Sequence, residues 1–182
     1  MRRWLAVAAA AAALGVTAWV APATATTSPY CGITWGSLAK QASAPGGGNL
    51  TNVRAGRHTC YDRLVLDVSG GRVGTWWVRY VDQVRMDGSG FVVPLRGGAK
   101  LEITAAVPAY DSAGRSTYRP ANRTELVNVT GFSTFRQVAW AGSFEGNSTV
   151  GLGVRARLPF RVFVLAGPGT GSRLVVDVAH RW

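Results

Sequence analysis

Three residues carry side chains that could support hydrolysis: His58, Asp62 and His180. Imidazole and carboxylate groups act as general acids and bases when they lie within hydrogen-bond reach of each other and of the substrate. Asp177 precedes His180 by three positions, which places the two on opposite faces of a continuous strand. The sequence also lacks the Gly-x-Ser-x-Gly pattern that presents a serine nucleophile in α/β-hydrolases. We therefore expect no catalytic residues, and a cell-wall hydrolase built on these three residues is the least favoured alternative.

Aromatic side chains close to arginines are better candidates for contact with a ligand. The six ligand-binding candidates are Trp77, Arg79, Tyr110, Tyr118, Arg136 and Trp140. Because alternate residues of a strand share a face, Trp77 lies beside Arg79, and Trp140 and Phe144 share the face of Arg136. Flat aromatic surfaces next to cations suit sugar rings or peptides, but large aromatic residues also fill protein cores. Both interpretations remain open.

A similar phrase occurs twice, as RLVLDV at residues 63–68 and as RLVVDV at residues 173–178. In each copy an arginine stands four positions before an aspartate, and this spacing puts both side chains on one face of a strand. Arg63, Asp67, Arg173 and Asp177 are therefore candidates for structural ion pairs between strands. The alternative, which also stays open, is that the arginines bind carboxylates or phosphates of a ligand in bidentate fashion.

The elements that must position these residues are β-strands, because polar and apolar residues alternate with period two. The expected strands are residues 61–68, 75–85, 100–106, 125–130, 136–143, 149–157, 161–166 and 173–179, separated by glycine-rich turns. Residues 76–81 are the expected partner of the first phrase, and residues 159–165 that of the second. This pattern predicts an all-β fold, a β-sandwich of two packed, mostly antiparallel sheets, in which two halves of a duplicated unit face each other.

The first 25 residues have the pattern of a secretory signal peptide. Arg2 and Arg3 form its positive end, residues 5–20 are apolar and rich in alanine, and Ala23 and Ala25 flank Thr24 as a small-residue cleavage site. We expect the chain to be secreted, with no integral membrane contact after cleavage. The general secretory and twin-arginine routes both remain open.

The two cysteines, Cys31 and Cys60, are expected to form a disulfide, since an exported chain meets an oxidising compartment. Residues 26–54 have little strand pattern and contain a run of three glycines, which predicts a disulfide-tethered N-terminal segment followed by a flexible loop. Residues 55–182 are expected to form the sandwich domain. Two cysteines and two histidines without short spacing do not predict a metal site, and we expect no cofactor.

The chain is strongly basic, with a formal net charge of +11 from 20 basic and 9 acidic residues. Cleavage after Ala25 removes Arg2 and Arg3 and leaves a formal charge of +9. Such an excess favours polyanions as partners, and outside the cell these are anionic wall polymers or lipid headgroups. The arginines are spread among apolar positions rather than gathered in a block, so we expect no nucleic-acid partner.

Several motifs together resemble the AMIN-like domain of secreted actinobacterial proteins. The motifs are RHTCYDRLVLDV at 57–68, YVD at 80–82, DGSG at 87–90, VPL at 93–95, PFRVF at 159–163 and RLVVDVAH at 173–180. The resemblance covers roughly residues 55–181. It implies kinship to AMIN domains, which are β-sandwich modules of cell-envelope proteins that help direct enzymes and secretion machinery to peptidoglycan. It implies no catalytic site.

The expected function is therefore non-catalytic binding at the cell wall, to peptidoglycan or to an associated anionic wall polymer. A module that pairs with another exported protein through a sheet edge or an aromatic face is the alternative from a different class. The exposure of the candidate aromatic residues distinguishes a binding surface from a packed core.

Overall fold

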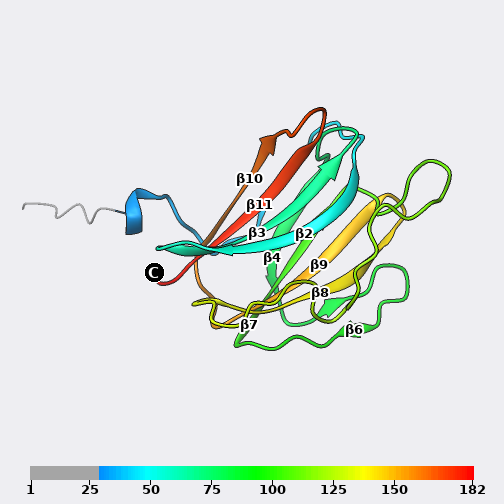
Figure 1. The fold of residues 1–182 in the computed structure, drawn as a ribbon. Coiled ribbons are helices and arrows are strands. Elements are labelled where there is room, and N and C mark those ends of the chain that lie inside the picture. Colours follow the sequence, from blue (N-terminus) through cyan, green and yellow to red (C-terminus); the bar gives the residue numbers. More distant parts are fainter. Residues whose placement is uncertain (1–28) are drawn as a thin grey trace, which may run out of the picture.

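The structure is a computed structural model that describes residues 29–182, and it confirms the predicted all-β sandwich (Figure 1). One sheet has five antiparallel strands in the order β1 (Lys40–Ala42), β4 (Trp76–Val81), β7 (Ala99–Ala105), β9 (Asn147–Val154) and β8 (Phe135–Phe144). The other has four, in the order β10 (Phe160–Ala166), β11 (Ser172–Ala179), β3 (Tyr61–Ser69) and β2 (Asn49–Arg57). A short ladder joins β5 (Val84–Arg85) to β6 (Val92–Val93), and a 3-10 turn, η1 (Tyr30–Gly32), comes first.

The core lies between the two sheets and follows from the alternation along each strand. Leu64 and Leu66 of β3 are fully buried on the inner face of the four-stranded sheet. Leu101 and Ile103 of β7 are equally buried on the facing sheet and belong to the same apolar cluster. Each side chain of this kind stabilises the fold by about 1.5–3 kcal/mol when it leaves water. The period-two pattern therefore decides which face of each strand turns inward.

The two similar phrases lie side by side in one sheet, so the prediction that they face each other was wrong. They form β3 and β11, which pair antiparallel in the four-stranded sheet (Figure 1). The predicted pairing of β10 with β11 is confirmed, but β4, the expected partner of β3, belongs to the opposite sheet. The alternation determines the buried face of a strand, whereas it carries no information about which strand is the neighbour.

Three further strand predictions need correction. Residues 49–57 form β2, in a region where little strand was expected, and a bulge between Leu50 and Asn52 breaks the alternation there. Residues 125–130 form no strand; the backbone N–H of Leu126 donates instead to Val138 O of β8 at 2.8 Å. The expected strand 75–85 is divided into β4 and β5. The alternation of apolar residues encodes neither bulges nor the points at which strands end.

The N-terminal segment is tied to the sandwich by the predicted disulfide between Cys31 and Cys60. Trp35 packs against Tyr61 of β3, with ring centroids 6.0 Å apart. The predicted signal peptide lies outside the described residues. Within residues 29–182, no helix has the length and apolar character that crossing a membrane demands.

The segment of residues 82–97, which contains β5 and β6 and is called the β5–β6 arm here, covers part of the outer face of the five-stranded sheet. Val84 and Val93 of the arm form a second, small apolar cluster with Ala139 and Ala141 of β8. Gly151 of β9 allows this approach, because a Cβ there would stand 2.7 Å from a methyl group of Leu95. The arm shields β8 and β9 and leaves the outer face of β4 and β7 open.

Candidate functional site

A groove of about 310 Å³ runs between the β5–β6 arm and the open outer face of β4 and β7. It is named the Trp77 groove here, and its lining includes Trp77, Arg79, Arg85, Asp87, Gly88, Glu102, Thr104, Phe144, Asn147 and Thr149. Strands, the arm and the β8–β9 hairpin all contribute to it. Residues from separate parts of the chain thus converge on one hollow.

The floor of the Trp77 groove is polar, although it lies on a sheet with a mainly apolar inner face. Thr104 of β7 and Thr149 of β9 stand opposite each other in the register, and their hydroxyl oxygens are 2.9 Å apart. Alternation turns them outward because Ile103 and Val150, their respective neighbours, point into the core. Thr104 and Thr149 are only 5% and 2% exposed, so the floor is polar but its hydroxyl groups are satisfied mainly by each other.

One wall of the groove combines an aromatic ring with an ion pair. Trp77 of β4 is half-buried and stands opposite Thr104. Arg79 stands opposite Glu102, and its Nε and Nη2 both donate to Glu102 Oε1, at 3.0 and 2.8 Å. The Arg79 side chain is 55% exposed, so the pair adds less than about 1 kcal/mol to stability. Its cation and carboxylate instead place fixed charges beside the ring of Trp77.

Phe144 supplies a second aromatic ring at the end of the groove. A bulge in β8 between Trp140 and Gly142, where Gly142 has a φ of 118°, shifts the alternation of the strand. Trp140 therefore points into the core, while Phe144 is 50% exposed and packs beside Gly88 of the arm. The predicted common face for Trp140 and Phe144 is wrong, because the bulge inserts a residue between them.

Asp87 is a half-buried acid of the groove. Its backbone N–H donates to Ala141 O at 2.8 Å, which holds the arm against β8. Burial raises the pKa of the Asp87 carboxyl, and a hydrogen bond with Thr149 partly offsets this effect. Within residues 29–182, Asp87 Oδ2 is buried without a hydrogen-bond partner. An unsatisfied acceptor of this kind gains when a hydroxyl or amide donor reaches it.

These features suit a sugar ring better than a reacting centre. The rings of Trp77 and Phe144 offer apolar faces, and the carboxylate of Asp87 and the amide of Asn147 offer hydrogen bonds beside them. A small number of polar groups among aromatic side chains is the usual composition of a small-molecule site.

The structure brings only part of the six predicted ligand-binding residues together. Trp77 and Arg79 line the groove, and Tyr110 lies near its end, where its hydroxyl accepts a hydrogen bond from Gly146 N at 2.9 Å. Tyr118 packs edge-on against Trp140, with ring centroids 5.3 Å apart, and Trp140 is only 5% exposed. For these two the core-packing interpretation holds, and burial raises the pKa of Tyr118 to about 12.

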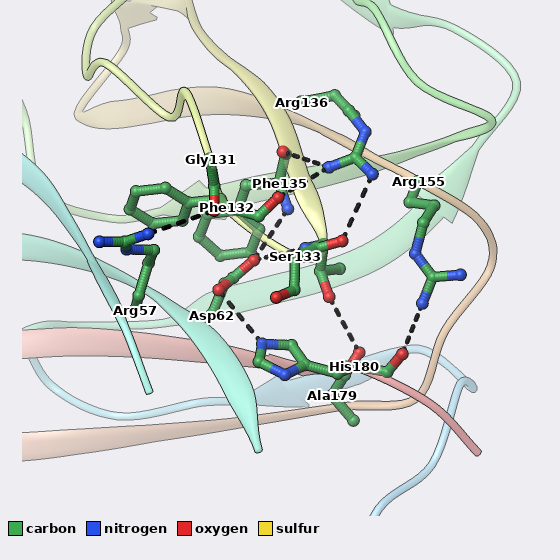
Figure 2. Close-up of polar contacts among 11 residues, drawn as sticks. Arg57, Asp62, Gly131, Phe132, Ser133, Phe135, Arg136, Arg155, Ala179 and His180 are labelled. Atoms are coloured by element: carbon green, nitrogen blue, oxygen red, sulfur yellow. Dashed lines mark hydrogen bonds and ion pairs between the residues drawn. The ribbon is translucent and has the colours of Figure 1, made fainter. Parts of the chain in front are cut away.

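Arg136 is not part of the groove lining, and its contacts are drawn in Figure 2. Its guanidinium donates to the backbone oxygens of Phe132, Ser133 and Phe135, at distances from 2.8 to 3.3 Å. It borders a separate hollow of about 350 Å³ next to these residues. Because its donors are engaged on backbone carbonyls, Arg136 orders the turn before β8.

Of the three residues considered for hydrolysis, Asp62 and His180 are in contact, whereas His58 is not part of this pair. Asp62 is fully buried and accepts hydrogen bonds from Thr134 N and from Phe135 N, the latter at 3.1 Å (Figure 2). His180 Nε2 lies 3.2 Å from the same carboxylate, a contact made possible because β11 ends at Ala179. His58 stacks instead on Tyr61, with ring centroids 4.6 Å apart.

The Asp62–His180 contact connects the ends of three strands. Thr134 Oγ1 donates to Ala179 O at 3.3 Å, so the turn before β8 is fixed to both β3 and β11. A carboxylate that accepts two backbone N–H groups and faces a histidine is well satisfied in this structural position. The pairing of Asp62 with His180 was not predicted, since 118 residues separate them.

Sequence reasoning also missed Asp87, Glu102, Thr104 and Thr149. Glu102 and Thr104 occupy the polar positions of the expected strand 100–106, so alternation alone marks them as outward-facing. Asp87 lies in the DGSG segment, which carries only a turn signal. Its place in the groove depends on the path of the arm, which no short-range pattern specifies.

A model of the AMIN-like domain family matches residues 48–180, a span that contains every strand except β1. No curated protein and no solved structure matches the chain. A domain of this kind points to a module associated with the cell envelope, and AMIN-like domains are generally non-catalytic binding modules.

Proposed function

Because the chain belongs to the AMIN-like domain family, we propose that it is a secreted, non-catalytic module that binds peptidoglycan at the cell wall through the Trp77 groove. The observation that carries this proposal is the composition of the groove. Two aromatic rings, Trp77 and Phe144, flank a floor of hydroxyl groups on the open half of the five-stranded sheet.

Peptidoglycan fits this chemistry in two respects. Its glycan strands present sugar faces that stack on aromatic rings, and their hydroxyl and acetamido groups match Asp87 and Asn147. Its stem peptides carry carboxylates that match Arg79 and Arg85, the two cations that stand among the acids Asp87, Glu102 and Glu145 in the lining. An associated anionic wall polymer would interact with the same arginines, but its binding would not depend on the rings of Trp77 and Phe144.

The overall charge supports attachment to an anionic wall. The formal charge of +9 expected after cleavage is spread over both sheets as arginine rather than gathered in one block. Attraction of this kind is screened at high ionic strength, since the Debye length is about 8 Å at 0.15 M salt. Stacking of sugar rings in the groove is less sensitive to salt. Binding that persists at high salt therefore reports stacking, and binding that is lost reports charge attraction.

The test is retention of the chain without residues 1–25 on purified sacculi, at low salt and at 0.5 M salt. Trp77→Ala and Phe144→Ala are each expected to weaken binding by about tenfold, which corresponds to about 1.4 kcal/mol. Trp182→Ala and Phe91→Ala are the matched controls, since these side chains are 70% and 72% exposed outside the groove. The same samples are assayed for released muropeptides, and none is expected.

The proposal fails if the parent chain is not retained at low salt, or if the groove variants bind like the controls. Sustained release of muropeptides would revive the hydrolase alternative. In that case Asp62→Asn and His180→Gln should abolish the release, because these residues form the described His–Asp pair.

A second function, pairing with another exported protein, is favoured by the exposed edge of the four-stranded sheet. β10 is an edge strand, and its Val164 and Leu165 are 42% and 36% exposed. An apolar edge strand is a template for an added strand. A stoichiometric partner that co-purifies with the chain and is lost on Val164→Lys would support this function; retention on sacculi without any partner would favour the glycan site.

A further inference from the structure

The four residues that recur in the two phrases are arranged around an approximate two-fold axis within the four-stranded sheet. Arg63 of β3 stands opposite Asp177 of β11, and Arg173 of β11 stands opposite Asp67 of β3. Sequence repetition and antiparallel pairing thus create two equivalent Arg–Asp positions on the outer face of one sheet. Their side chains nevertheless adopt different contacts.

At one position two arginines form ion pairs with the same aspartate. Arg63 donates to both carboxylate oxygens of Asp177, from Nε at 2.6 Å and from Nη2 at 2.9 Å. Arg161 of β10 adds a bond to Asp177 Oδ2 at 2.8 Å, and Asp177 has no exposed side-chain surface. The rings of Tyr61 and Phe163 lie within 5.5 Å of these guanidinium groups and cover them. At this end the buried carboxylate of Asp177 is shared by Arg63 and Arg161.

At the equivalent position the carboxylate is occupied by a different arginine. Asp67 accepts two bonds from Arg54 of β2, at 2.8 and 3.0 Å, and one from Asn52 at 3.2 Å. Arg173 stands opposite but forms no ion pair within residues 29–182. Its Nη2 donates to Ala166 O at 2.9 Å, and its buried Nε has no partner in that part of the chain. Arg173 is the cation left over when Arg54 takes its carboxylate.

A cavity of about 520 Å³ lies at this end of the sheet, and it is named the Arg173 cavity here. It is lined by Arg54 and Arg173, by Ser69 at the end of β3, and by Thr170 of the glycine-rich turn between β10 and β11. Two guanidinium groups and one carboxylate, that of Asp67, give the lining a net charge of +1. The Arg54 side chain is 51% exposed and reaches solvent from the rim.

From this arrangement we propose that the Arg173 cavity binds a phosphate group. A guanidinium presents parallel N–H donors that match the oxygens of phosphate in bidentate fashion. Arg54, Arg173 and the hydroxyl groups of Ser69 and Thr170 approach from different elements, so they suit a tetrahedral oxyanion better than a planar carboxylate. Rotation of the Arg173 side chain brings Nε to the ligand and sacrifices no hydrogen bond from that atom.

Two sources carry this chemistry, inorganic phosphate and the phosphodiesters of an anionic polymer. The site lies on the sheet opposite the Trp77 groove and does not depend on the proposed binding of sugars there. A polymer with repeated phosphates also gains from rebinding of neighbouring groups, since a second phosphate is held at high effective concentration. The affinity per phosphate therefore distinguishes the two sources.

The experiment is an NMR titration of the oxidised chain without residues 1–25, which follows arginine Nε–Hε and backbone amide signals. The probes are inorganic phosphate, oligomeric glycerol phosphate and acetate at constant ionic strength. We expect saturable shifts of the Arg173 Nε–Hε and Thr170 amide signals with both phosphate probes. Arg173→Gln should weaken phosphate binding at least tenfold. Arg173→Lys should recover only part of the lost affinity, because a lysine ammonium cannot bind phosphate in the bidentate manner of a guanidinium.

Arg123→Gln is the matched control, because it removes the same charge from an exposed residue at the edge of the other sheet. It should leave phosphate affinity within twofold of the parent value. At least tenfold tighter binding per phosphate for the oligomer assigns the site to a polymer, and equal binding assigns it to free phosphate. Equal affinity for acetate, or non-saturating shifts shared by all arginines, would overturn the proposal. Loss of sacculus binding by Trp77→Ala bears on the groove alone.

Discussion

The hydroxyl of Tyr80 forms two hydrogen bonds with the backbone of Leu158: it donates to the carbonyl oxygen at 2.7 Å and accepts from N–H at 3.0 Å. Tyr80 belongs to β4 and Leu158 lies just before β10, so this single side chain connects the two sheets. Its ring also packs edge-on against Phe160, with centroids 5.7 Å apart. The contact satisfies two backbone groups at a point where neither can join a ladder.

Tyr80→Phe is therefore expected to lower the free energy of unfolding by about 1–3 kcal/mol, because both polar groups of Leu158 lose their partner. Urea denaturation measures the change. Tyr118→Phe serves as the control: Tyr118 is also partly buried and also has a pKa of about 12, but its shift comes from burial alone. If both variants lose the same stability, the bridge to Leu158 contributes nothing specific.

The same two tyrosines predict how stability depends on alkaline pH. Burial raises the pKa of both Tyr80 and Tyr118 to about 12, whereas an unfolded tyrosine titrates near 10. Between these values the unfolded chain has released protons that the folded chain retains, so the free energy of unfolding falls as pH rises. We expect a decline from pH 10 to 12 that is shallower in the double variant Tyr80→Phe/Tyr118→Phe. An unchanged slope would contradict this expectation.

Asp62→Asn should destabilise the sandwich strongly. The fully buried carboxylate accepts two backbone N–H groups and faces His180, so the substitution weakens three contacts at once. We expect a loss on the order of 3 kcal/mol, as for removal of one partner from a buried pair. Calorimetry of the variant beside Asp82→Asn, which changes an exposed aspartate, isolates the effect of burial. Equal melting temperatures for the two variants would rule it out.

Asp87→Asn is expected to act in the opposite direction. Burial raises the pKa of Asp87 in the folded chain, so ionisation costs stability above the unfolded pKa, and this cost is absent at low pH. The amide should thus stabilise the chain at pH 7, by at most about 1 kcal/mol because the side chain is only half-buried, and change little at pH 3. Denaturation at both pH values, with Glu145→Gln as an exposed control, measures this. A loss of stability at pH 7 would contradict the assigned cause.

Removal of the disulfide should loosen the N-terminal segment before it unfolds the sandwich. Cys31 and Cys60 are 29 residues apart, and a crosslink of that size is worth about 3–4 kcal/mol in the chain-entropy description. Cys31→Ser/Cys60→Ser should lower the melting temperature and change tryptophan fluorescence, because Trp35 leaves Tyr61. The reduced parent chain should behave like the variant. No change in either observable would show that the segment is held by its packing alone.

The strands with unbroken alternation, such as those around Leu64, Ile103 and Val176, could be predicted from the sequence because burial of one face dominates their energy. The positions of the bulges could not be predicted from the sequence. A single inserted residue between Leu50 and Asn52, or between Trp140 and Gly142, reverses the faces without changing composition.

The candidate sites were predictable to the extent that they depend on one strand. Trp77 and Arg79 share a face by alternation, and they do line the groove. Asp87 and Phe144 join them through the arm and a bulge, which are tertiary features. Likewise Arg63 and Arg173 begin similar phrases, but Arg63 pairs with the aspartate opposite it, whereas Arg54 occupies the aspartate opposite Arg173.

The β5–β6 arm rests on its own small apolar cluster rather than on the main core. Residues that shape the mouth of the groove can therefore vary with little penalty to the sandwich beneath them. Relatives of this chain can therefore differ in ligand preference through substitutions in the β5–β6 arm, while the two sheets beneath it stay the same.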